Sequence, residues 1–123
     1  MKRTLAVALG LGLCASAASA ADNYACYKAK DLKNPQFAGT VADLSDEIIP
    51  LQDNAEIKKP FLYCAPNSLN GGAISDPSTK LLCYKMKGTK GTDTTRTVTN
   101  AFGTVQVGVK AKTFVYCVPG TAS

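Results

Sequence analysis

The sequence predicts a small all-β domain, stapled by disulfides and built from two similar antiparallel β repeats. Three observations predict it: four cysteines follow an N-terminal export signal, the stretch FLYCAPN at residues 61–67 returns as FVYCVPG at residues 114–120, and apolar residues recur at every second position. A period of two is typical of strands, and an even cysteine count in a short exported chain is typical of a disulfide framework.

The export signal comes first in the chain. Residues 1–20 have two positive charges, a short apolar run and small residues that end at Ala20, which is the order of a secretory signal peptide. The apolar run is too short to span a bilayer. Cys14 is a poor lipid-attachment site because Leu13, not a small residue, precedes it. We expect cleavage near Ala20 and a secreted or periplasmic chain without a membrane span.

The charge of the mature chain is mild. Lys2 and Arg3 leave with the signal, so the formal net charge falls from +5 to +3. The remaining lysines are scattered and form no dense basic run, which argues against a nucleic-acid partner. We expect a solvated surface and a monomer.

The mature chain keeps four cysteines, Cys26, Cys64, Cys83 and Cys117. A zinc site is disfavoured because the sequence has no C-x-x-C pair and no histidine. We therefore expect disulfides, no metal and no other cofactor. Four cysteines allow three pairings.

The cysteines also mark an internal repeat. Each half opens with a C-Y-K motif and closes with Y-C-x-P, and the segment between the halves is rich in Asn, Gly, Ser and Pro. We expect a first β repeat at residues 21–66, a linker or turn at 67–80 and a second β repeat at 81–123, together forming one compact domain. If one unit was copied with its own staple, Cys26 pairs with Cys64 and Cys83 with Cys117, and we favour this pairing.

The strands between the cysteines differ in strength. In the first half, Glu47–Leu51 and Ala55–Lys58 are weak strand candidates, and Pro50 moves one of them to a sheet edge. In the second half, threonine-rich residues 96–100 and alternating valines at 105–109 predict a hairpin that turns at NAFG. A short turn is the only helix-like candidate, near the acidic residues 43–47.

Tyrosine and cysteine alternate along the opening and closing strands, so they lie on opposite faces. We interpret the tyrosine face as the shared core. The cysteine face then forms a second layer, which the disulfides cross-link and lysine side chains surround.

This pattern resembles an uncharacterised family of secreted bacterial proteins with repeats of C-Y-K, then F-G before a valine-rich strand, then a basic residue and C-x-P. The matching residues are Cys26-Tyr27-Lys28, Cys83-Tyr84-Lys85, Phe102-Gly103, Cys64-Ala65-Pro66 and Cys117-Val118-Pro119. They span nearly all of the mature chain, although the first half lacks the F-G turn. The resemblance implies a secreted domain with no assigned activity.

The sequence offers little for catalysis. Without histidine, a serine or cysteine nucleophile has no imidazole base, so we expect no catalytic residue and no enzyme. Asp43, Asp46 and Glu47 form the one acidic cluster. A carboxylate pair could hydrolyse glycosides, and such a cluster could hold calcium, but it lacks the calcium-loop spacing and fits a polar turn equally well.

Tyr24, Tyr27 and Tyr84 are candidate ligand-binding residues, because a tyrosine ring can stack on sugars, although core packing explains them as well. We expect a binding or surface-interaction module for an extracellular or envelope protein or a glycan. The alternatives are a disulfide-rich inhibitor of an extracellular enzyme, with residues 67–80 as its rigid loop, and a small carbohydrate-active enzyme.

If the disulfides are essential, folding requires an oxidising compartment. We expect residues 21–123, produced in a reducing cytosol, to fold poorly, as measured by thermal unfolding and thiol titration against the oxidised protein. A soluble product with four free thiols and the same melting temperature would contradict this prediction.

Overall fold

The computed structural model describes residues 21–123, and they form seven strands and no helix. The predicted signal peptide lies outside these residues. The strands are β2 (Asn23–Lys28), β3 (Thr40–Leu44), β4 (Gln52–Asn67), β5 (Thr79–Lys87), β6 (Thr94–Asn100), β7 (Gly103–Val109) and β8 (Val115–Thr121). Every pairing is antiparallel, so the predicted all-β class is confirmed.

The long strand β4 organises the main sheet. The order is β2–β4–β5–β8, and β3 pairs with β4 as well. β2 pairs with the C-terminal end of β4, where Cys26 faces Cys64, and β3 pairs with its N-terminal end, where Ala42 faces Ala55. One 16-residue strand thus carries both earlier strands and also contacts β5.

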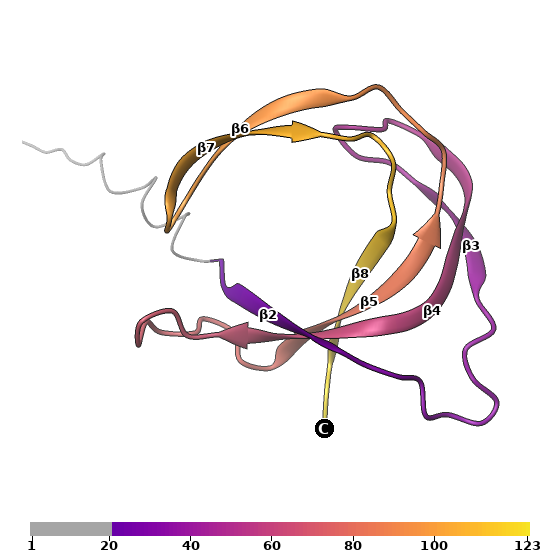
Figure 1. The fold of residues 1–123 in the computed structure, drawn as a ribbon. Helices are drawn as coiled ribbons and strands as arrows, with labels where there is room; N and C mark the ends of the chain where they lie inside the picture. The colour runs from indigo at the N-terminus through magenta and orange to yellow at the C-terminus, as the bar shows by residue number, and fades with distance from the viewer. Residues whose placement is uncertain (1–20) are drawn as a thin grey trace, which may run out of the picture.

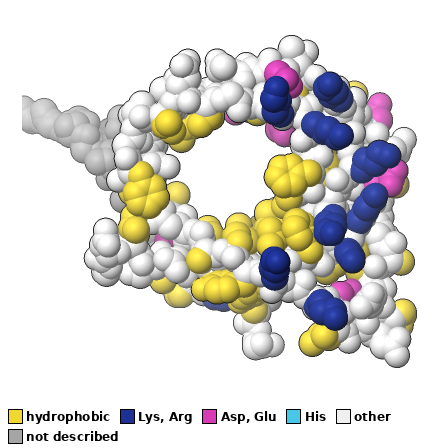
Figure 2. Space-filling model, in the orientation of Figure 1, with side chains coloured by type: hydrophobic (Ala, Val, Ile, Leu, Met, Phe, Trp, Pro, Cys, Tyr) yellow, Lys and Arg dark blue, Asp and Glu magenta, His cyan; other side chains and the backbone are white. Residues whose placement is uncertain are grey.

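β6 and β7 form a separate hairpin with Val98 opposite Val105, and they turn where the sequence predicts. Figure 1 shows this hairpin arching opposite the curved main sheet, so that the hairpin and the sheet together form a ring. Hydrophobic side chains lie along the inner rim of the opening (Figure 2). The valine strand and the threonine-rich strand are therefore confirmed, but the hairpin does not join the main sheet.

The core is small and lies where β3, β4 and β5 meet. Ala55, Ile57 and Met86 are buried, with Ala42, Leu44 and Tyr84 packed around them. Ile49, Gln52 and Ala111 are also buried but lie outside this cluster; Ile49 and Ala111 both border Gly91, and Gln52 borders Gly88. Thr113 Oγ donates a hydrogen bond of 3.2 Å to Oε1 of the buried Gln52.

Two strand candidates of the first half have different outcomes. Residues 55–58 lie inside β4, as predicted. The strand predicted at residues 47–51 is wrong, because residues 47–50 form a bend and Leu51 belongs to no strand. The carboxylate of Asp46 accepts the backbone N–H groups of Ile48 and Ile49, each at 2.8 Å. These side-chain bonds compete with a strand ladder and hold the segment as a corner.

The favoured disulfide pairing is confirmed. Cys26–Cys64 and Cys83–Cys117 each join directly opposed residues, at Cα separations of 4.0 and 3.9 Å. Such short Cα distances are typical of opposed residues that exchange no backbone hydrogen bonds.

The prediction of a tyrosine core is only partly right. Tyr84 is covered by Phe37, whose ring centroid lies 5.4 Å away, and packs against the core cluster. The prediction that Tyr27 and Tyr116 belong to the core is wrong, because their side chains are 58% and 38% exposed. Both lie on edge strands of the sheet, β2 and β8.

Gly88 tests the packing at the base of the hairpin. A Cβ at Gly88 would overlap Oε1 of Gln52, which is buried and bonded to Thr113, so it cannot move without losing that bond. We expect Gly88→Ala to destabilise the protein by roughly 1–3 kcal/mol in denaturant unfolding. Gly108→Ala is the matched control, since no atom lies within 4 Å of its added Cβ, and equal stabilities of the two variants would contradict the packing.

Candidate ligand-binding site

Two adjoining open grooves lie beside the junction of β4 and β5. The larger has a volume of about 860 Å³ and runs between the start of β3 and residues 56–59 of β4. The smaller, of about 410 Å³, runs between the segment after β2 and residues 59–62. Lys59 and Lys85 line both, so we treat the two as one surface and call it the lysine groove.

The lysine groove carries more positive than negative charge, because five lysines line it against two carboxylates, Glu56 and Asp31. Its five lysines are exposed: Lys28, Lys30, Lys58, Lys59 and Lys85. The ion pairs within residues 21–123 are Arg96–Glu47 and Lys110–Asp93, so none of the five has an ion-pair partner there. Figure 2 shows Lys and Arg side chains gathered on the side of the ring that β3 and β4 form.

An irregularity in β4 directs two of these lysines, Lys58 and Lys59, towards the groove. The register between β4 and β5 shifts between Ile57 and Pro60 and again between Pro60 and Leu62. Pro60 has no N–H to donate, and a bulge redirects the side chains around it. The consecutive residues Lys58 and Lys59 can therefore both reach the groove.

Two aromatic residues, Phe37 and Phe61, contribute to the apolar lining of the groove. The Lys85 ammonium lies 5.5 Å from the centre of the Phe61 ring, a cation–π contact. Phe37 is held in place by Asp31, whose carboxylate accepts its N–H at 2.6 Å and that of Lys33 at 2.9 Å. These two bonds favour the charged form, so they hold the pKa of Asp31 below its usual value.

Gly39 lets the loop before β3 approach β4 closely. Its φ of +92° is a conformation that residues with a side chain rarely adopt, and an added Cβ would lie 3.1 Å from the carbonyl oxygen of Ile57. The loop that carries Phe37 is thus fixed at one side of the groove.

The three candidate tyrosines do not form one binding strip. Tyr24 and Tyr27 are three residues apart on β2, so they point to opposite faces of the sheet. Tyr84 contacts Phe37, which itself lines the lysine groove. Sequence reasoning missed the groove, although the lysine of each C-Y-K motif and the pair Lys58–Lys59 were visible signals.

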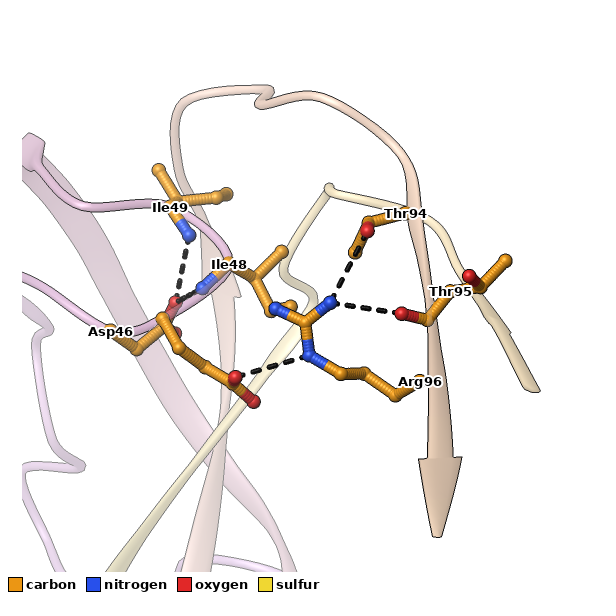
Figure 3. A network of polar contacts seen from close by, with 7 residues as sticks. Asp46, Ile48, Ile49, Thr94, Thr95 and Arg96 are labelled. Atoms are coloured by element: carbon orange, nitrogen blue, oxygen red, sulfur yellow. Dashed lines mark hydrogen bonds and ion pairs between the residues drawn. The ribbon is translucent and has the colours of Figure 1, made fainter. Parts of the chain in front are cut away.

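The acidic cluster forms a structural corner. Asp43 accepts the N–H of Asn54 at 2.9 Å, and the two backbone bonds to Asp46 lower the pKa of its carboxyl group. Glu47 pairs with Arg96 at 3.1 Å, and Arg96 also bonds Thr94 and Thr95 (Figure 3). Within residues 21–123, no three Asp, Glu, Cys or His side chains are grouped to hold a metal ion.

The loop between β4 and β5 is held by two carboxylates, that of Asp22 just before β2 and that of Asp76 within the loop. The Asp22 carboxylate accepts the N–H groups of Ser75 and Asp76, at 2.7 and 2.9 Å. Asp76 in turn accepts bonds from the hydroxyls of Ser78 and Thr79, at 2.7 and 2.6 Å. The loop is exposed, and hydrogen bonds fix its C-terminal half.

Comparison of the chain with protein-family models, with curated proteins and with solved structures finds no match. Among residues 21–123, no helix is long and apolar enough to cross a membrane.

The titration of Asp76 tests the loop. Hydroxyl bonds from Thr79 and Ser78 lower its pKa to about 2, so the stabilisation is complete above the ordinary value of 3.8 and is lost as the pH falls through about 2. We expect the carboxyl carbon of Asp76 to titrate near 2 by NMR. Ser78→Ala with Thr79→Val should move the pKa of Asp76 towards 3.8, and an unchanged value in that variant would contradict the assigned bonds.

Proposed function

We propose that the protein is an exported, non-catalytic binding module whose lysine groove takes an anionic glycan. The observation that carries the proposal is that Lys59 and Lys85 line both grooves, so they place positive charge along one continuous open surface. An anionic ligand lying there would meet several ammonium groups at once, without displacing any ion pair of residues 21–123.

The floor of the groove favours a glycan over a bare anion. Phe37 and Phe61 offer apolar rings of the kind that stack on the faces of sugars. The open shape suits an extended chain better than an enclosed small molecule, which usually sits in a deep pocket. Carboxylated or sulfated sugar units combine both chemistries, a flat apolar face and a negative charge.

Two lysine-to-glutamine variants test the proposal. We expect the wild-type protein to bind heparin and polygalacturonate, with affinity that falls as salt is added, and not to bind neutral dextran. Lys59→Gln with Lys85→Gln should weaken binding about tenfold in titration calorimetry, since each exposed ion contact contributes about 0.5–1 kcal/mol.

The control for this experiment is Lys90→Gln with Lys112→Gln. It removes the same charge from exposed residues that face each other at the base of the hairpin, and neither residue lines the groove. Its affinity should stay within twofold of the wild-type value. Equal losses in the two variants would show that net charge alone drives binding, and no binding of either polyanion would contradict the proposal.

The loop between β4 and β5 favours an inhibitor as a second candidate function. Asp22 and Asp76 fix its backbone before any partner arrives, and a rigid loop loses little entropy on binding. The carbohydrate-active enzyme has less support, because Asp43, Asp46 and Glu47 are each engaged by a different partner.

A further inference from the structure

The two disulfides touch each other across the sheet. Cys26–Cys64 joins β2 to β4, and Cys83–Cys117 joins β5 to β8. The Sγ atoms of Cys64 and Cys83 lie 3.7 Å apart. Both sulfurs are disulfide-bonded and carry no hydrogen, so this is a direct van der Waals contact. Because the strand order is β2–β4–β5–β8, the four sulfurs form one row from edge to edge of the sheet.

Exposure differs sharply along this row. The inner residues Cys64 and Cys83 are 0% and 1% exposed, whereas the outer residues Cys26 and Cys117 are both exposed. A thiolate from solution can therefore reach only an outer sulfur. In thiol–disulfide exchange the attacked sulfur keeps the new bond and its former partner leaves as a thiolate. The leaving sulfur is thus always an inner one, already in contact with the second disulfide.

We propose that the four cysteines form a thiol–disulfide relay that passes an exchange reaction from one edge of the sheet to the other. In the first step, an external thiolate attacks Sγ of Cys26, forms a mixed disulfide there and releases the thiolate of Cys64. In the second, Cys64 attacks Cys83, forms a Cys64–Cys83 disulfide and releases the thiolate of Cys117, which takes a proton from water. Attack on Cys117 runs the same sequence in reverse.

Two features favour the second step, the attack of Cys64 on Cys83, over a Cys64 thiol that stays free. The Cys64 thiolate forms at a fully buried position, where a charge is poorly solvated, so transferring it to the exposed Cys117 is favourable. The inner sulfurs are diagonal neighbours, because Cys64 is opposite Leu81 and Cys83 is opposite Leu62. The new bond needs a small shift of β4 against β5, since diagonal pairs lie slightly beyond the usual Cα spacing of a disulfide.

The experiment exposes the native oxidised protein briefly to glutathione and then alkylates free thiols with excess iodoacetamide. We expect singly reacted molecules to carry glutathione on one outer cysteine and the alkyl group on the other. A tryptic peptide containing Cys64 should then be joined to the peptide containing Cys83. Alkylation of outer cysteines should exceed that of inner cysteines at least tenfold.

The same reaction in 6 M guanidinium chloride is the control, because unfolding removes the contact between the inner sulfurs without any substitution. There, alkylation should fall on inner and outer cysteines alike. A second control, Cys83→Ser with Cys117→Ser, removes the acceptor disulfide and should leave the Cys64 thiol free but buried, so that it is alkylated only when iodoacetamide is added together with 6 M guanidinium chloride. Native protein that is alkylated on Cys64 or Cys83, or that yields no Cys64–Cys83 peptide, would overturn the relay.

Discussion

The pairing of opposed cysteines is the constraint on which the rest of the structure depends. Within residues 21–123 the buried hydrophobic residues are Ile49, Ala55, Ile57, Cys64, Cys83, Met86 and Ala111. None is aromatic, and two are disulfide cysteines. Such a core contributes little hydrophobic stabilisation, as is usual for very small domains. The disulfides close chain segments of 38 and 34 residues, and each contributes about 4 kcal/mol in the chain-entropy model.

Because disulfides cross-link the sheet, fewer large side chains have to be buried in a core. Side chains that a larger core would bury remain exposed, including Tyr27, Phe102 and Phe114. The register shifts in β4 then turn one junction of the sheet into a basic groove with an aromatic floor. Different parts of β4 thus serve stability and the candidate site: Cys64 forms a disulfide, and Lys59 lines the groove.

The sequence was informative where the pattern is local or duplicated. The repeated cysteine motifs predicted the disulfide pairing, and the alternation of Val105 and Val107 predicted β7. The bend at residues 47–50 was missed because one carboxylate, Asp46, outweighs the β-forming tendency of two isoleucines. Only the bonded geometry reveals that competition.

Other features depend on the tertiary arrangement and could not be predicted locally. The exposure of Tyr27 follows from the position of β2 at a sheet edge, which alternation alone does not give. The groove gathers lysines from three separate segments, at residues 28–30, 58–59 and 85. In the sequence these lysines are scattered, so the mild net charge concealed a local concentration of charge.

The attachment of the β6–β7 hairpin has a consequence for motion. The hairpin shares no strand ladder with the main sheet, and its base is held by contacts such as Arg96–Glu47 and Thr113–Gln52. Its valines 98 and 105 are 43% and 55% exposed, and no disulfide crosses it. It therefore has the character of a separate foldon. Amide hydrogens of β6 and β7 should exchange through local opening, at a lower free energy than those of β4 and β5, so the ring can widen while the cross-linked sheet stays folded.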